Sequence, residues 1–148
     1  MKDLEKKTCR IALVQAEPVM FDKAASLDKA LGRIKEAAAG GAELSVFPEL
    51  CIPGYPVGMN FGFSVGKRTE DGRKDWKRYY DASVVAGETE FQQLAQAAQK
   101  TGAYISLGFS ERDAVNGTHL LRKWWIRKVW ERGKCRETTW QSPYHFPR

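Results

Sequence analysis

The chain has 148 residues, of which 43% are hydrophobic and 28% are charged, as expected for a soluble globular protein. This length accommodates one ordinary domain with a core and is too short to argue for two. No apolar run approaches the roughly 20 residues that a membrane span needs, and residues 1–7 are polar with no signal-peptide core behind them, so we expect a cytoplasmic setting.

The net charge of +6 is confined to the C-terminal end. Residues 119–148 contain eight Lys or Arg and two Asp or Glu, whereas the other 118 residues carry sixteen of each. The main body therefore gives no indication of an anionic partner such as nucleic acid. The three cysteines, Cys9, Cys51 and Cys135, form no CxxC pair, and the whole chain has only two histidines that could join them as ligands. Neither a disulfide framework nor a zinc site is therefore indicated.

The first third of the chain follows a strand, helix, strand pattern. Residues 8–16 form a compact apolar run that predicts a buried strand. Asp22 or Ser26 can cap the helix that follows, and the glycine pair at 40–41 ends it. Residues 44–47 form a second short apolar run. Two strands joined by a helix through short connections predict a parallel crossover unit and an α/β fold.

Glu49 stands where this second strand must end. Pro48 cannot donate to a sheet ladder, and a turn at residues 53–56 follows. Ligands of open parallel sheets bind outside the carboxyl ends of strands, so Glu49 is a candidate general base. The alternative is a helix N-cap or a solvated loop glutamate. Cys51 suggests a Cys–Glu dyad, although most cysteines in such positions are small buried hydrophobes.

An insertion at residues 56–86 separates Glu49 from the next regular elements. Its first half is rich in glycine and aromatic residues, and its second half predicts a helix with Trp76, Tyr79 and Tyr80 on one side. Long loops in compact domains are usually functional or disordered. Because aromatic residues are dense here, we interpret the insertion as a pocket wall or a subunit contact rather than a solvated excursion.

The remaining elements predict a further helix, strand and hairpin. Thr89 is the expected N-cap of a helix that Gly102 closes, and residues 103–109 predict a third strand. The polar segment after this strand ends in Asn116-Gly117, a strong hairpin signal. A fourth strand should therefore begin near Thr118.

The stretch from residue 41 to residue 56 resembles the first active-site signature of the nitrilase family, within the carbon-nitrogen hydrolase superfamily. Ser45 departs from it, because the family usually has an apolar residue there; a single serine is tolerable in a buried strand, where its hydroxyl can bond a neighbouring carbonyl. The resemblance continues through residue 118 and implies an α/β fold, the N-terminal part of a four-layer αββα sandwich that 148 residues cannot complete. The matching residues are Gly41, Leu44, Phe47, Glu49, Ile52, Gly54, Tyr55 and Pro56.

The resemblance also implies a chemistry. Members of the family hydrolyse nitriles to carboxylic acids and ammonia with a cysteine nucleophile, a glutamate base and a lysine, without a metal or an organic cofactor. Glu49 matches the base, and the implied partners are a small-molecule nitrile or amide and further copies of the chain in a homo-oligomer. The insertion would contribute to the substrate pocket and to subunit association. Alternatives are an amidase of the same superfamily, or a non-catalytic fragment that associates with full-length relatives or an anionic partner.

Residues 119–148 form a basic, Trp-rich tail that departs from the family pattern. Lys134 or Glu137 falls near the position of the family lysine, and Cys135 comes too early to be the nucleophile. A shifted reading frame is one interpretation. A genuine segment that binds nucleic acid or an acidic membrane surface, and a divergent strand pair with a disordered end, are the others. We therefore expect this chain by itself to be weakly active or inactive.

Overall fold

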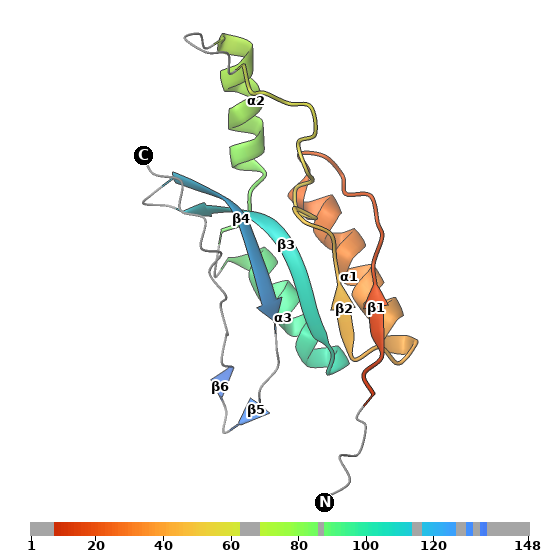
Figure 1. Ribbon diagram of the computed structural model, residues 1–148. Helices are drawn as coiled ribbons and strands as arrows, with labels where there is room; N and C mark the ends of the chain where they lie inside the picture. Colours follow the sequence, from red (N-terminus) through yellow and green to blue (C-terminus); the bar gives the residue numbers. More distant parts are fainter. Residues whose placement is uncertain are drawn as a thin grey trace, which may run out of the picture.

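Four strands form one mixed sheet, with the order β1–β2–β3–β4 (Figure 1). The computed structural model describes residues 8–62, 69–85 and 88–113, together with the backbone of the strands that follow. Strands β1, β2 and β3 are parallel, and β4 runs antiparallel to β3. The elements in chain order are β1 (Ile11–Leu13), α1 (Lys23–Ala39), β2 (Leu44–Val46), α2 (Glu70–Asp81), α3 (Thr89–Thr101), β3 (Tyr104–Asp113), β4 (Gly117–Ile126), β5 (Trp130–Glu131) and β6 (Lys134–Cys135).

Helices α1 and α3 cover one face of this sheet, whereas α2 stands beyond the end of β3 (Figure 1). Side chains on a strand alternate between the two faces. Ile105, Leu107 and Phe109, each at most 1% exposed, therefore point from β3 toward the helices. The helices contribute apolar residues at helical spacing to this core: Leu27, Ala30 and Ile34 from α1, and Phe91, Leu94 and Ala98 from α3.

The ends of α1 and α3 follow local chemistry. The Oδ1 atom of Asp22 accepts a hydrogen bond of 2.9 Å from the backbone of Ala25, which caps α1 as predicted. Gly102 ends α3 with a φ of +70°, which glycine adopts without strain. The Nζ atom of Lys23 lies 2.8 Å from Oε1 of Glu90 and joins the first turns of the two helices.

The predicted α/β class, the parallel crossover and the antiparallel pairing of β3 with a fourth strand that begins at Gly117 are confirmed. Three details differ. The first strand is limited to three residues, the same length as its partner β2, and β3 continues through residues 110–113, which the sequence predicted as a polar loop. Thr89 is the first residue of α3 and not its cap; Glu88 takes that position without a side-chain hydrogen bond.

The hydroxyl of Ser45 is another difference. The side chain is fully buried on the helix-covered side of β2, and among the described residues its Oγ atom has no hydrogen-bond partner. The hydrogen bond that a serine in a buried strand can make to a neighbouring carbonyl is therefore not formed among the described residues.

The boundary predicted between residues 118 and 119, where the family resemblance ends and the basic tail begins, falls inside β4. Of residues 119–148, only the backbone of β4, β5 and β6 is described, so the interpretations of the tail stay predictions. Among the described residues, no helix is long and apolar enough to cross a membrane.

Candidate functional site

Glu49 lies on a tight turn directly after β2, at the carboxyl end of the parallel strands. The backbone amide of Phe47 donates to the carbonyl of Ser106 at 2.8 Å, which continues the ladder for one residue beyond β2. The chain then turns at Leu50, whose φ is +47°, and the amide of Gly54 closes the turn on the Leu50 carbonyl at 3.1 Å. Glu49 is exposed and Leu50 is buried. The side chain of Leu50 thus anchors the turn, while the carboxylate of Glu49 lies on the surface.

Gly108 on β3 lets this turn cross the sheet. Its position alternates with Leu107 and Phe109, so a side chain there would point away from the helices. The backbone of residues 48–50 occupies that space: a Cβ atom at Gly108 would lie 3.0 Å from the Leu50 nitrogen and 3.2 Å from the Glu49 Cα atom. The turn that bears the Glu49 carboxylate is therefore held against the backbone of β3, on the face of the sheet opposite α1 and α3.

The segment after Glu49 is held at several further points. Ile52 forms an isolated parallel bridge with Phe109, and the amide of Ser110 donates to the Ile52 carbonyl at 2.9 Å. The amide of Phe21 donates to the Pro53 carbonyl at 3.1 Å, and the Ile52–Pro53 peptide bond is cis. These contacts join the turn to β3 and to the segment that precedes α1.

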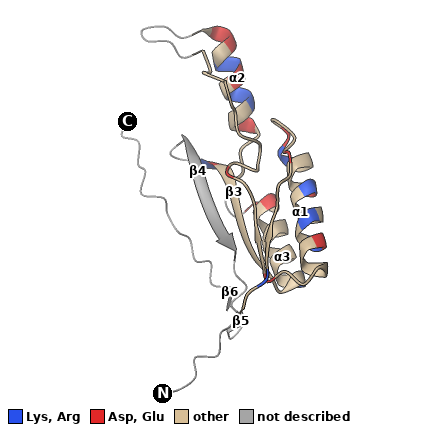
Figure 2. Cartoon of the chain, turned by 45° about the vertical axis from the view of Figure 1, so that its right-hand side comes forward, with Lys and Arg blue, Asp and Glu red and all other residues tan. Residues whose placement is uncertain are grey.

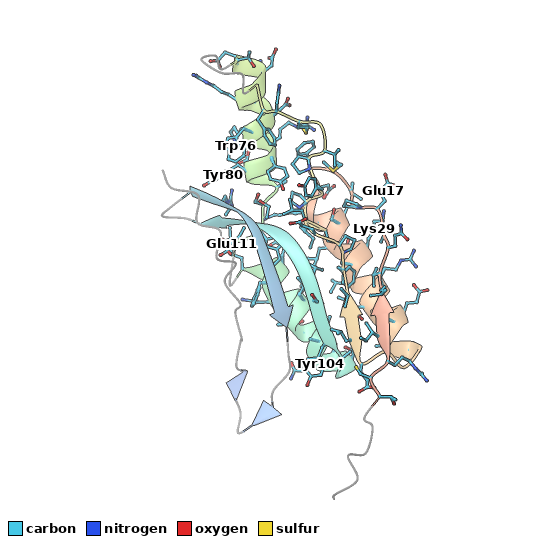
Figure 3. The ribbon with its side chains drawn as sticks, viewed as in Figure 1. Glu17, Lys29, Trp76, Tyr80, Tyr104 and Glu111 are labelled. Carbon is cyan, nitrogen blue, oxygen red and sulfur yellow. The ribbon has the colours of Figure 1, made fainter. Side chains whose placement is uncertain are left out.

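Helix α2 packs against this anchored segment through aromatic side chains. Tyr79 is fully buried, with its ring centroid 6.2 Å from that of Phe21 and 5.7 Å from that of Phe61, and Trp76 lies 5.2 Å from Phe61. Burial raises the pKa of the Tyr79 phenol. Tyr80 has a different partner: the guanidinium of Arg112 lies over its ring, 5.2 Å from the centroid, near the end of β3 (Figure 3). The predicted helix is confirmed, and its aromatic side chains have two sets of partners: Phe21 and Phe61 for Tyr79, and Arg112 for Tyr80.

Two buried serines fasten the end of α2 to β3. The Ser83 hydroxyl donates to the Tyr79 carbonyl at 2.9 Å, and its Oγ atom also lies 2.9 Å from Oγ of Ser110. The amide of Val84 donates to the Ser110 carbonyl at 2.8 Å. The sequence did not indicate Gly108, Ser83 or Ser110 as supports, because small residues in a strand give no pattern that separates close packing from chance.

Cys51 cannot act as a nucleophile beside Glu49. Its side chain is 6% exposed, and burial raises the pKa of the thiol to about 11, so the thiolate is scarcely populated at neutral pH. Cys9 is exposed but precedes β1, and therefore lies at the opposite edge of the parallel strands. The interpretation of Cys51 as a small buried hydrophobe is confirmed, since its side chain belongs to the core, and this burial argues against the Cys–Glu dyad.

Two hollows on the described surface also lie away from Glu49. One of about 520 Å³ is formed by residues around the start of β1 and β2, including Cys9, Arg10 and Glu43. Another of about 560 Å³ lies between α1 and α3, where Leu31 and Ala97 contribute to its lining. Among the described residues, no three His, Cys, Asp or Glu side chains are grouped to hold a metal ion.

The side chains of the tail residues that were considered for catalysis are not among those that the structure describes. Lys134 and Cys135 belong to β6, of which only the backbone is described, and Glu137 lies outside the described residues. Their predicted relation to the family lysine and cysteine stays a prediction.

Comparison with known sequences agrees with the resemblance of the Glu49 stretch. The sequence profile of the carbon-nitrogen hydrolase family matches residues 10–134. An aliphatic nitrilase of Sinorhizobium fredii (strain HH103) is 45% identical over 104 residues, which cover 70% of this chain and 34% of that protein. A bifunctional nitrilase/nitrile hydratase of Lupinus angustifolius is 42% identical over 111 residues, covering 75% and 32% respectively. The chain thus matches about a third of the length of these curated relatives.

Solved structures support the fold. A glutamine-dependent NAD(+) synthetase from Cytophaga hutchinsonii superposes with a TM-score of 0.51 and 23% identity, over 82% of this chain and 17% of that one. The corresponding enzyme from Acinetobacter baumannii, in complex with ADP, gives a TM-score of 0.53 and 17% identity over 82% and 19%. At these identities the likeness concerns the fold alone.

Proposed function

The chain belongs to the carbon-nitrogen hydrolase family, and from that premise we propose that it is part of a nitrilase-type hydrolase with Glu49 as general base. The proposed reaction converts a small nitrile to a carboxylic acid and ammonia. The observation that carries this proposal is the placement of Glu49: a carboxylate at the carboxyl end of parallel strands, on a turn held by Gly108 and by the Ser110–Ile52 hydrogen bond. The similarity to an aliphatic nitrilase supports the substrate class.

In the proposed mechanism, Glu49 accepts the proton of a cysteine thiol as its sulfur attacks the nitrile carbon. A nearby cation would stabilise the negative charge that develops on nitrogen. Water then attacks the resulting thioimidate, ammonia leaves, and a second hydrolysis breaks the thioester and returns the thiol. The role of Glu49 is to hold a proton and give it back at each addition and elimination.

This mechanism requires groups beyond those described. Glu49 is exposed, so a further protein surface must cover it to exclude water from the reacting atoms. The described thiols of Cys9 and Cys51 are excluded by position and burial. Loss of the nucleophile alone lowers the rate of such a catalytic unit about a million-fold. We therefore propose that this chain by itself turns over nitriles weakly or not at all.

Ammonia release from aliphatic and aromatic nitriles tests the inactivity of the isolated chain. We expect release no greater than the buffer background. Clear turnover that Glu49→Gln abolishes, with Glu17→Gln unchanged, would contradict the inactivity and would support the role of Glu49. Glu17 is the matched control, because it is also exposed and follows a parallel strand of the same sheet.

A chimera tests the base itself. Residues 10–118 would replace the corresponding part of the Sinorhizobium fredii aliphatic nitrilase, which supplies the rest of the fold. We expect Glu49→Gln in the chimera to lower kcat by at least about 10⁴-fold, as removal of a base from a nucleophile–base unit does. Glu17→Gln should retain activity. Equal activity of the Glu49→Gln chimera and its parent would refute the assignment.

The same chimera separates the alternatives. An amidase would release ammonia faster from amides than from nitriles. The similarity of this chain to an aliphatic nitrilase and to a bifunctional nitrilase/nitrile hydratase favours nitriles. If the chain is a non-catalytic module, the folded chimera should release no ammonia from either substrate.

A further inference from the structure

The Glu49 turn and the end of α2 meet the same edge of β3. Ile52, which follows the turn, forms a parallel bridge with Phe109. Val84, which follows α2, forms a parallel bridge with Glu111. The other edge of β3 is occupied by β4. Since Phe109 and Glu111 are two residues apart on one strand, the end of α2 lies directly beside the segment that carries Glu49.

Ser110 is the residue of β3 that binds both segments. Its amide donates to the Ile52 carbonyl at 2.9 Å, and its carbonyl accepts from the Val84 amide at 2.8 Å. Its hydroxyl lies 2.9 Å from that of Ser83, and both serines are fully buried. Because the Ser83 hydroxyl donates its single hydrogen to the Tyr79 carbonyl, Ser110 is the donor between the two serines. Every polar group of Ser110 is thus used at this junction.

Tyr79 joins α2 to the Glu49 turn by a second route. Its buried ring packs edge-on against the ring of Phe21. The amide of Phe21 in turn donates to the carbonyl of Pro53, four residues after Glu49. The last turn of α2 therefore contacts the Glu49 segment through a hydrogen-bonded route and an aromatic route.

The charged side chains of α2 add little to this attachment. They alternate in sign along the helix (Figure 2), and several are paired within it: Glu70 with Arg73, Asp71 with Lys74 and Asp81 with Lys77. A further pair, 3.9 Å between Asp81 and Arg112, lies at the same end as Ser83. Exposed ion pairs of this kind contribute little to stability. The buried contacts of Ser83 and Tyr79 therefore set where α2 meets the sheet.

We propose that Ser83 and Ser110 are positioning residues for Glu49, which act by coupling the end of α2 to the Glu49 turn. This inference rests on the proposed role of Glu49 as general base. Without the Ser83 hydroxyl, the buried Ser110 donor loses its acceptor and the junction opens more often. The turn then loses part of its anchor at Ile52. A displacement of about 1 Å in a catalytic group can lower the rate about 100-fold.

Hydrogen exchange of the full chain, followed by NMR, tests the coupling without any activity. Ser83→Ala should raise the exchange rates of the Ser110 amide and of the Gly54 amide, which closes the Glu49 turn, about tenfold. The Leu94 amide within α3 should not change. Thr101→Val is the matched control, because Thr101 also donates to the carbonyl four residues earlier, at the end of α3 beside the start of β3. This variant should leave Ser110 and Gly54 unchanged.

Ser110→Ala breaks the same hydrogen bond from the other side. It should also raise the exchange rate of the Gly54 amide, which gives the coupling a second test if Ser83→Ala does not fold. The double variant Ser83→Ala/Ser110→Ala should raise this rate by less than the product of the two single effects, because no buried donor is left without an acceptor.

Kinetics of the chimera test the positioning role. Ser83→Ala should lower kcat about tenfold with KM unchanged, because the proposed base is displaced while substrate binding is not. Thr101→Val should retain the activity of the parent chimera. A loss that arose only from a smaller folded fraction would appear in circular dichroism and in the exchange of Leu94.

Two results would overturn the proposal. The first is an exchange rate of Gly54 that stays unchanged in Ser83→Ala and Ser110→Ala, or that rises no more than that of Leu94. The second is an unchanged kcat in the Ser83→Ala chimera while Glu49→Gln abolishes activity. If the Glu49→Gln chimera were fully active, the proposed base would be refuted, and the exchange rates would decide the coupling on their own.

Discussion

The two faces of the sheet use the same three strands and differ in what lies over them. On one side, α1 and α3 bury Ile105, Leu107 and Phe109 almost completely. On the other side, Leu13 and Ile11 are more than half exposed. Both sets are apolar, so composition does not separate them. An apolar side chain of this sheet therefore stabilises the fold only where helices bury it. This difference in burial sets the change in the free energy of unfolding that we expect for each substitution below.

The largest effect is expected from emptying the covered face. Phe109→Ala removes a fully buried ring from the core and should lower the free energy of unfolding by about 3–5 kcal/mol. Leu13→Ala, on the open face, should change it by no more than about 0.5 kcal/mol. Urea unfolding at a protein concentration where the chain is monomeric measures both. Similar losses for the two variants would show that the open face is also packed.

A smaller effect is expected where the Glu49 turn crosses the open face. Gly108→Ala places a Cβ atom 3.0 Å from the Leu50 nitrogen and should cost about 1–3 kcal/mol as backbone atoms move apart. Gly32→Ala is the control, because no atom lies within 4 Å of its added Cβ within α1. That variant should stabilise the chain by about 0.5–1 kcal/mol. Opposite signs in urea unfolding are the expected outcome; equal signs would argue against the close contact.

The covered face contains one polar residue that the comparison predicts to be unfavourable. Ser45 is fully buried and its hydroxyl has no partner among the described residues, so Ser45→Ala should stabilise the chain by about 1 kcal/mol. Ser83→Ala, equally buried but hydrogen-bonded to Tyr79 and Ser110, should destabilise it by about 1–2 kcal/mol. Thermal unfolding ranks the two variants against the parent. A loss of stability in Ser45→Ala would indicate an unseen partner for the hydroxyl.

The smallest effect concerns the ion pair between the two helices of the covered face. Burial raises the pKa of Glu90, but hydrogen bonds from Lys23 and the backbone, with the charges of Lys23 and Arg112, outweigh it and lower the pKa below its ordinary value of 4.5. A lowered carboxyl pKa stabilises the folded chain above the unfolded-state value, and this contribution is lost as pH falls through the folded-state value.

Lys23→Met should therefore reduce the free energy of unfolding by less than about 1 kcal/mol at pH 7. The difference from the parent should disappear in acid, below pH 4.5. Urea unfolding across this pH range provides the measurement. Arg33→Met, which removes an exposed pair with Glu36, serves as the control and should show a smaller change. A difference between Lys23→Met and the parent that persists in acid would assign the effect to packing of the lysine stem.

The sequence predicted the elements whose signals are local. Asp22 at the start of α1 and Gly102 at the end of α3 each act through their own backbone neighbours, and both were found. The antiparallel strand pair predicted from Asn116-Gly117 was found as well. Thr89 shows the limit of such signals, since a threonine beside Glu88 fits either the cap or the first turn. The contact between Tyr80 and Arg112 could not be predicted from such signals, because Arg112 lies far along the chain.

The candidate site was predictable only in part. The strand end at Pro48 placed Glu49 at the correct edge of the sheet, because proline stops a ladder wherever it occurs. Its exposure depends on what lies above the turn, and no pattern within residues 41–56 contains that information. The burial of Cys51 likewise follows from packing against the core and not from its distance to Glu49 in the sequence.

Gly108 has a consequence for how this fold tolerates change. The height of Glu49 above the sheet is set by two stretches of main chain in contact at Gly108, and not by the length of a side chain between them. Core residues beneath the helices can therefore be exchanged without lifting the carboxylate. Any residue larger than glycine at position 108 should therefore displace the turn that carries Glu49, and a longer side chain should displace it further than alanine does.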